Sequence, residues 1–410
     1  MDRVAHPSTP DLVFDVLSST DHAEGAKIRV IGVGGGGGNA VAHMIARGIR
    51  GVDYICTNTD AQALSALRQE CATLQLGAKL TRGLGAGARP EQGRAAAEAD
   101  RDLIKGMLSG ADMVFITAGM GGGTGTGAAP VIARIARELG ILTVAVVTRP
   151  FGFEGKKRHL AAEEGIDQLI SEADSMITIP NEKLLTALGR KVSLTEAFAQ
   201  ANDVLLNAVQ GIAELITCPG MINLDFADVT TVMKNTGLSM MGVGMAEGEQ
   251  RARLAVEQAI HSPFLDDLDL RDASGILVNV TASDDLGLGE FSEISEAMAE
   301  LASDDTNVIV GTSIDPSMGD RIRVTVVATG LQHKEVPQVV INPVQMNKVA
   351  QPERSYEWSK HEDLPPASIS RFPFGAAPES GTTERPSKNM RDRAMEELDI
   401  PTFLRRQARA

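Results

Sequence analysis

The segment Gly119-Met120-Gly121-Gly122-Gly123-Thr124-Gly125-Thr126-Gly127 decides the fold. It follows an apolar, strand-like segment at 113–116 and precedes a helical pattern at 128–139. Glycines in such a turn let backbone N–H groups approach an anion without obstruction, and the helix N-terminus adds partial positive charge. We therefore expect a phosphate group as the ligand. The segment contains no lysine, so it is not a P-loop of the form G-x-x-x-x-G-K-[ST].

A second glycine run, GVGGGGGN at 32–39, also stands between a strand-like segment and a helical pattern, which begins at Ala40. Its residues Gly32, Gly34 and Gly37 satisfy G-x-G-x-x-G, the fingerprint of dinucleotide-binding folds. Taken alone, this run is compatible with a dinucleotide or with a nucleoside triphosphate. A third interpretation, that both runs are flexible linkers, is disfavoured because each run joins a strand to a helix.

Together, the two runs resemble the tubulin/FtsZ superfamily of GTPases, whose signature is GGGTGTG, and GVGGGGGNAV is similar to the bacterial FtsZ branch. The resemblance continues through NTDAQAL at 58–64, GLGAGA at 83–88, FEGKKR at 153–158 and NLDFADV at 223–229. It covers roughly residues 27–330 and resumes at the C-terminus. It implies a GTPase that binds GTP or GDP and forms a homopolymer by head-to-tail assembly, located in the cytoplasm at the mid-cell division ring.

Composition narrows the class of protein. The chain has 410 residues, 43% of them apolar, which suffices for two domains, and a net charge of −15 with only 3% aromatic residues. These values disfavour a nucleic-acid partner and attraction to anionic lipid. The three cysteines, Cys56, Cys71 and Cys218, match no zinc motif and suit a reducing compartment, and Cys56 is predicted to be a core residue. We expect no direct membrane insertion, because no stretch is long and apolar enough to span a bilayer.

The alternation of strand and helix patterns predicts an α/β fold. Its parallel-sheet nucleotide-binding domain is joined by a long central helix to a smaller mixed-sheet α+β domain, and a disordered tail follows. Strands are expected at 28–33, 52–57, 73–76, 112–118, 142–148, 176–179, 276–282, 307–313 and 321–329. Helices are expected at 91–108, 128–139, 193–217, 226–234, 248–261 and 290–302.

The predicted divisions of the chain follow from these patterns and from the resemblance. They are a mobile N-terminal extension at 1–26, a GTP-binding domain at 27–192, the central helix at 193–217, a C-terminal GTPase-activating domain at 218–332, a disordered linker at 333–390 and a partner-binding peptide at 391–410. Because ligands of parallel α/β sheets bind at the carboxyl ends of strands, both glycine runs are expected to line one site.

The last part of the chain changes in composition twice. Residues 333–390 hold eight of the 18 prolines and show no helical or strand period, which is typical of a linker. Apolar residues then gather near the end, and the segment resembles the FtsZ C-terminal peptide. The resemblance implies that it binds an actin-like membrane tether and other division proteins through Leu398, Asp399, Ile400, Pro401, Phe403 and Leu404.

Backbone N–H groups of the two glycine runs are predicted to bind the phosphates. The residues are Gly35, Gly36, Gly37, Gly38, Asn39, Gly122, Gly123, Thr124, Gly125 and Thr126. The threonine hydroxyls can donate to phosphate oxygens or cap the following helix. For Thr124, a role as helix cap alone is the alternative.

Other contacts to the nucleotide are implied by the resemblance. Glu154 and Arg158 would contact the ribose and a nearby phosphate, although their spacing by itself predicts only an i,i+4 salt bridge. Asp203, on the polar side of the central helix, would accept from N1–H and the 2-amino group of guanine, which adenine lacks; alone, it reads as part of a solvated helix face. Phe198 belongs to the apolar stripe of that helix and is expected to be a core residue, with stacking on the base as the alternative.

The hydrolytic residues are also assigned by resemblance. Asp225 stands at the start of a helix and by itself reads as its N-cap. The resemblance implies instead that its loop enters the nucleotide site of the neighbouring subunit, where Asp225 and Asp228 polarise the attacking water and Asn223 helps to position it. Mg²⁺ is implied, because carboxylates beside a triphosphate need charge compensation, and no protein ligand of a metal is assigned.

Two other functions compete with this interpretation. A dehydrogenase would use the G-x-G-x-x-G run and an acid for the ribose, for which Asp60 is suitably placed. A non-catalytic relative would co-assemble with an active GTPase of the family or regulate it. The catalytic positions, however, show no departure from the family pattern. The departures are the N-terminal extension, the short linker, and Cys218 where a basic residue is common.

Overall fold

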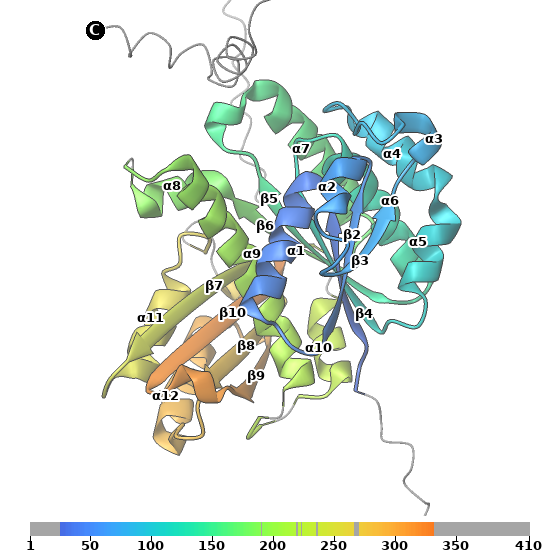
Figure 1. Ribbon diagram of the computed structural model, residues 1–410. Coiled ribbons are helices and arrows are strands. Elements are labelled where there is room, and N and C mark those ends of the chain that lie inside the picture. The colour runs from blue at the N-terminus through green and yellow to red at the C-terminus, as the bar shows by residue number, and fades with distance from the viewer. Residues whose placement is uncertain are drawn as a thin grey trace, which may run out of the picture. The chain divides into compact units, whose positions relative to one another are not determined.

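The computed structural model describes residues 25–331, apart from 190, 219, 223, 235–236 and 266–269 (Figure 1). The predictions for most of the N-terminal extension, for the linker and for the C-terminal peptide lie outside the described residues, as does Asn223. They stay predictions.

Within the described residues, ten strands form one sheet in the order β3-β2-β1-β4-β5-β6-β7-β10-β8-β9. The strands are β1 Ile28–Val33, β2 Val52–Asn58, β3 Ala72–Gln75, β4 Met113–Gly119, β5 Leu142–Arg149, β6 Ser175–Pro180, β7 Leu238–Glu247, β8 Gly275–Ala282, β9 Asn307–Ile314 and β10 Arg321–Leu331. The α/β fold class predicted from the sequence is confirmed.

The first six strands of this order are parallel. The central strands β4 and β5 are buried along most of their length, because helices cover both faces of the sheet. Parallel strands end at the same edge, so the segments that follow β1, β2, β4 and β5 meet there. This edge brings the two glycine runs together.

The second part of the sheet is mixed, as predicted. Strand β10 pairs antiparallel with both β7 and β8, and β8 pairs parallel with β9. The two parts of the sheet are continuous through a short parallel pairing of β6 with β7, at Met176↔Leu238 and Ile177↔Ser239.

Strand β7 is absent from the sequence-based prediction. Its glycines explain both the omission and the packing. A Cβ atom at Gly242 or Gly244 would lie 2.0 or 1.9 Å from a backbone oxygen of the helix 251–260. The glycines therefore let that helix pack directly on the strand, but they remove the β-branched signal by which strands are recognised.

The helices are α1 Gly34–Arg47, α2 Ala61–Ser65, α3 Ala78–Thr81, α4 Pro90–Ala99, α5 Arg101–Leu108, α6 Thr124–Glu138, α7 Lys156–Ile170, α8 Asn181–Leu188, α9 Leu194–Thr217, α10 Phe226–Met233, α11 Arg251–Ile260 and α12 Leu288–Leu301, with 3₁₀ turns η1 Gly152–Glu154, η2 Leu270–Asp272 and η3 Pro316–Met318. The helix predicted at 91–108 is two helices, α4 and α5. They are separated at Asp100, whose carboxylate accepts a hydrogen bond from the Gly77 N–H at 2.5 Å.

Two hydrophobic cores lie on opposite faces of the parallel strands. One is formed with α4 to α7 and includes Ile116 and Ile132; the other is formed with α1 and α9 and includes Phe115, Met44 and Ile212. A third core packs α11 and α12 against β8 and β10. Cys56 is 1% exposed in the second core, as predicted, and burial raises the pKa of its thiol.

The central helix α9 contacts both parts of the sheet. It begins after Ser193, whose hydroxyl accepts from the Glu196 N–H at 3.2 Å. Its apolar side belongs to the core with α1. Near its C-terminal end, Glu214 forms a buried ion pair with Arg323 of β10, at 2.7 Å between Oε2 and Nη2. The helix therefore joins the two domains, as predicted. Among the described residues, no helix has the length and apolarity to cross a membrane.

Candidate functional site

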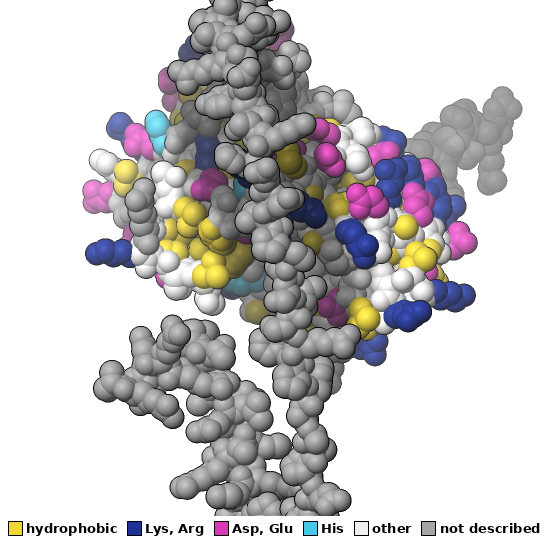
Figure 2. All heavy atoms as spheres, turned by 90° about the horizontal axis from the view of Figure 1, so that it is seen from above, with side chains coloured by type: hydrophobic (Ala, Val, Ile, Leu, Met, Phe, Trp, Pro, Cys, Tyr) yellow, Lys and Arg dark blue, Asp and Glu magenta, His cyan; other side chains and the backbone are white. Residues whose placement is uncertain are grey.

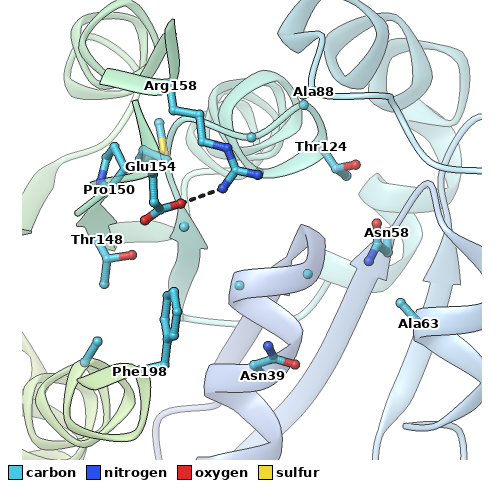
Figure 3. A pocket seen from close by; sticks show the side chains of 18 of the residues that line it. Asn39, Asn58, Ala63, Ala88, Thr124, Thr148, Pro150, Glu154, Arg158 and Phe198 are labelled. Atoms are coloured by element: carbon cyan, nitrogen blue, oxygen red, sulfur yellow. Dashed lines mark hydrogen bonds and ion pairs between the residues drawn. The ribbon is translucent and has the colours of Figure 1, made fainter. Parts of the chain in front are cut away.

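A cavity of about 600 Å³ opens at the carboxyl ends of the parallel strands (Figure 3). Both glycine runs line it, through the segments that lead from β1 into α1 and from β4 into α6. The first N–H groups of a helix have no partner within the helix, and the helix dipole favours an anion beside them. The cavity thus presents two helix N-termini to a ligand.

The first glycine run forms the first turn of α1, whereas the second run ends β4 at Gly119, turns at 120–123 and enters α6 at Thr124. Helix α1 begins at Gly34 and α6 at Thr124, both earlier than the sequence suggests. A Cβ atom at Gly35 or Gly122 would meet nothing within 4 Å and would extend into open space. At Gly34, whose φ is +73°, it would lie 2.8 Å from the Gly125 nitrogen. Some glycines therefore keep the cavity open, and others let the two runs approach each other.

Most of the predicted phosphate-binding residues line the cavity: Gly35, Gly36, Asn39, Gly122, Gly123, Thr124 and Gly125. Gly37, Gly38 and Thr126 do not. Gly37 packs against β4, since a Cβ atom there would lie 2.4 Å from the Thr117 oxygen. The Thr126 hydroxyl accepts a hydrogen bond from the Gly121 N–H at 2.8 Å and holds the turn.

Glu154 and Arg158 both line the cavity and also pair with each other (Figure 3). Arg158 Nη1 lies 2.5 Å from Glu154 Oε2, while Glu154 Oε1 accepts from the Phe151 N–H at 2.9 Å. The i,i+4 salt bridge is thus present at the wall of the cavity. Both side chains line the cavity, and their contact with a ribose and a phosphate stays a prediction.

Phe198 lies on the cavity wall and is 42% exposed, so it is not a core residue (Figure 3). Its ring meets Phe151 edge-on, with centroids 5.2 Å apart and an interplanar angle of 88°. Phe151 in turn stacks on Phe153 at 5.1 Å. The ring therefore has a fixed support and an exposed face, which suits stacking on a planar ligand.

Asp203 does not line the cavity, although its neighbour Asn202 does. Asp203 Oδ1 lies 2.7 Å from His43 Nε2 and 3.3 Å from Arg47 Nη2. Both partners come from α1. The alternative of a freely solvated helix face does not describe Asp203, whose side chain is 26% exposed and held by these two contacts, and its contact with guanine stays a prediction.

Several lining residues were not predicted. Asn181 is 4% exposed and lines the cavity, and among the described residues its amide oxygen has no hydrogen-bond partner. Asn58 and Asp60 approach from the end of β2, and one oxygen of Asp60 caps α2 by accepting from Gln62 and Ala63. Asn58 and Asp60 could have been found from the sequence, because both belong to the segment NTDAQAL that carries the resemblance. For Asn181, no local sequence pattern indicates a place in the site.

Asp225 and Asp228 lie outside this cavity. Asp225 Oδ1 accepts from the Asp228 N–H at 2.8 Å, so Asp225 is the N-cap of α10, and both residues are exposed. Figure 1 shows α10 at the lower end of the sheet, whereas α2, which follows the carboxyl end of β2, lies at the upper end. The two carboxylates and the cavity are thus on different ends of the same subunit.

The surface charges are mixed in sign. Figure 2 shows described Lys and Arg side chains interspersed with Asp and Glu on the face seen from above. Among the described residues, no group of three or more His, Cys, Asp or Glu side chains is arranged to hold a metal ion.

Comparison with known proteins identifies the family. Residues 27–189 match the model of the Tubulin/FtsZ family, GTPase domain, and residues 237–332 match the FtsZ family, C-terminal domain. The chain is 52% identical over 384 residues to Cell division protein FtsZ of Wigglesworthia glossinidia brevipalpis, covering 93% of this chain and 97% of that one. It is 54% identical over 391 residues to Cell division protein FtsZ of Pseudomonas aeruginosa, covering 94% and 98%.

Comparison with solved structures supports the same family assignment. The empty FtsZ dimer of M. jannaschii matches with a TM-score of 0.71 and 45% identity, over 75% of this chain and 89% of that one. CetZ1 from Haloferax volcanii, a GDP-bound monomer, is 19% identical with a TM-score of 0.66, over 75% and 95%, and shares the fold. The dehydrogenase interpretation and the non-catalytic one are not supported. The chain belongs to the FtsZ family of tubulin-like GTPases, which bind GTP or GDP and polymerise in cell division.

Proposed function

We propose that each subunit binds GTP in the described cavity, and that Asp225 and Asp228 of a second subunit complete the hydrolytic site. One observation carries this proposal: the two carboxylates lie outside the cavity, on α10, at the other end of the sheet. Head-to-tail contact would bring the α10 end of one subunit onto the cavity of the next. Such contacts do not close on themselves and produce filaments.

The phosphates are proposed to lie on the two helix N-termini. Gly35 and Gly122 leave the open space that a phosphate chain would occupy, and Thr124 lines that space with a hydroxyl group. Backbone N–H groups of Gly36, Asn39, Gly123 and Gly125 complete the cradle. Gly37, Gly38 and Thr126 then support the cradle through packing and the turn hydrogen bond.

The base and the ribose are proposed to lie between α9 and the η1 segment. Phe198 offers its exposed face for stacking, and the unpartnered oxygen of Asn181 can accept from the base. A contact of Asp203 with guanine is proposed from the resemblance alone, because its side chain does not line the cavity and its Oδ1 is held by His43 and Arg47. Glu154 and Arg158 would contact the ribose and a phosphate from the opposite wall.

The two catalytic carboxylates differ in how they are held. One oxygen of Asp225 already caps α10. The Asp228 side chain is exposed, and the structure gives it no hydrogen bond or ion pair within the described residues. Asp228 is therefore the better placed to accept a proton from water, with Asp225 and Asn223 orienting that water.

Mg²⁺ is proposed to accompany the nucleotide. The residues that line the cavity fit an ion held mainly by phosphate oxygens and water. Its two acidic side chains already have other partners, because Asp60 caps α2 and Glu154 pairs with Arg158. Mg²⁺ characteristically keeps several waters and binds substrate phosphates. When bound, it would offset the charge that builds up beside the carboxylates of the second subunit.

The partners and the location of the filament are proposed from the family. The chain would form the mid-cell ring in the cytoplasm, and its peptide at 391–410 would bind an actin-like membrane tether and other division proteins through Leu398, Asp399, Ile400, Pro401, Phe403 and Leu404. Recruitment to the membrane would then be indirect. The linker at 333–390 would separate the filament from the tether.

A mixing experiment tests the shared site. Asp228→Ala subunits would bind GTP but supply no base, while Gly122→Val subunits would lose the phosphate space but keep an intact α10. Co-assembly in a 1:1 mixture is verified by sedimentation, and GTP turnover is then measured. We expect turnover well above the sum of the two separate proteins. Co-assembled filaments without such a gain would contradict a site built from two subunits.

A further inference from the structure

A buried threonine lies directly behind the phosphate cradle. Thr59 follows β2, is 0% exposed and does not line the cavity, although Asn58 and Asp60 on either side do. Its hydroxyl oxygen lies 2.6 Å from the hydroxyl oxygen of Thr124. Thr124 begins α6 and lines the cavity. The pair therefore connects the end of β2 with the N-terminus that faces the phosphates.

The direction of this hydrogen bond follows from what each hydroxyl can reach. Either oxygen could donate at this distance. Among the described residues, Thr124 is the one partner that the structure gives to the Thr59 hydroxyl. If Thr124 donated, the proton of Thr59 would be buried without an acceptor, which is energetically costly. Thr59 must therefore donate and Thr124 accept.

This direction leaves the proton of Thr124 for an acceptor in the cavity. A hydroxyl that accepts one hydrogen bond becomes a stronger donor in the next. We propose that Thr59 is a positioning residue that orients and polarises the Thr124 hydroxyl toward a phosphate oxygen of the bound nucleotide. The inference rests on the proposed position of the phosphates.

The backbone keeps Thr59 in place. Its carbonyl oxygen accepts from the Thr81 hydroxyl at 3.2 Å and from the Gly85 N–H at 3.3 Å. The hydroxyl thus stands on a segment fixed by two other contacts, and its orientation does not depend on the ligand. Such a pre-set donor loses little conformational freedom when the nucleotide binds.

The test uses Thr59→Val, which removes the hydroxyl at nearly constant shape, and Thr59→Ser, which keeps it. Thr57→Val is the matched control, because Thr57 is a buried threonine two residues earlier, in β2, whose hydroxyl donates to the Gly32 oxygen instead. Equilibrium dialysis measures the Kd of GTP on the full chain below its assembly concentration. We expect Thr59→Val to weaken binding about five- to tenfold, and Thr59→Ser and Thr57→Val to stay within about twofold of the original chain.

A double variant distinguishes positioning from general support. If Thr59 acts through Thr124, Thr59→Val has no further effect on GTP affinity once Thr124→Val is present. Additive losses, or a Thr59→Val chain with the original affinity, would overturn the inference. If Thr124→Val alone leaves affinity unchanged, the proposed phosphate contact of Thr124 fails and the inference fails with it. Circular dichroism checks that each variant folds. If Thr59→Val does not fold, Thr59→Ala takes its place in the comparison of single and double variants.

Discussion

His43 Nε2 lies 2.7 Å from Asp203 Oδ1, which ties the helix that begins at the phosphate cradle to the central helix. Arg47 reaches the same oxygen at 3.3 Å. The phosphate end and the proposed base end of the site thus share α1 as a common support. Asp203 itself does not line the cavity, so its contact with the base stays a prediction.

Replacing Asp203 with asparagine should change the base preference. The carboxylate accepts from the N–H groups of guanine, whereas an amide can also donate, which suits the C2 carbonyl of xanthine. We expect the affinity for GTP to fall about tenfold or more and the affinity for XTP to rise relative to it. Competition binding with GTP and XTP measures this, with the exposed Asp167→Asn on α7 as control. An unchanged preference would limit Asp203 to joining α1 and α9.

Replacing Asp228 with alanine should remove turnover and spare binding. We expect turnover in assembled filaments to fall about 100-fold or more, because a positioned base contributes about that much. The Kd of GTP should stay within about twofold, since Asp228 lies outside the cavity. Thr231→Ala, also exposed on α10, is the control. A loss of nucleotide affinity comparable to the loss of turnover would place Asp228 in the binding site instead.

Deleting residues 396–410 should leave hydrolysis unchanged and abolish binding to the membrane tether. The deleted peptide lies far along the chain from both glycine runs and from α10, so neither half of the proposed active site is altered. Turnover and filament sedimentation are measured beside pull-down of an actin-like tether. A control deletion of equal length within the linker should retain the pull-down. A severe loss of turnover on removing the peptide would contradict the role assigned to it.

Replacing Arg323 with methionine should destabilise the fold. The substitution leaves the Glu214 carboxylate buried without its partner, and removing one member of a buried ion pair costs about 3–5 kcal/mol. Urea unfolding of the GDP-bound, unassembled chain measures the free energy of unfolding. The double variant Glu214→Gln/Arg323→Met should recover a large part of the loss, because no charge is then unpaired. A single variant within about 1 kcal/mol of the original would show that the pair adds little.

The sequence predicts the parallel half of the fold well because its strands are near-continuous apolar runs between helical patterns. It also places both glycine runs at one edge, since parallel strands end together. It does not predict β7, whose Gly242 and Gly244 fit the backbone of α11 rather than a strand propensity. Nor does it predict the break at Asp100, which depends on a hydrogen bond to Gly77 across the fold.

In the site, the residues found from the sequence are those in local motifs. Asn181 carries no such motif, and its role becomes visible only through burial and an unpartnered oxygen. The contact between Thr59 and Thr124 joins residues 65 apart in the chain, and that between His43 and Asp203 joins residues 160 apart. Such pairs depend on tertiary packing, which no periodicity or spacing encodes.

The measurement that tests the central claim most directly is GTP turnover per subunit as a function of protein concentration, with Mg²⁺ present. A site shared between subunits predicts turnover near zero at low concentration and a rise above a threshold, because a lone subunit keeps Asp225 and Asp228 away from its own cavity. A turnover per subunit that is constant at all concentrations would contradict the account, since it would mean that one subunit contains the complete hydrolytic site.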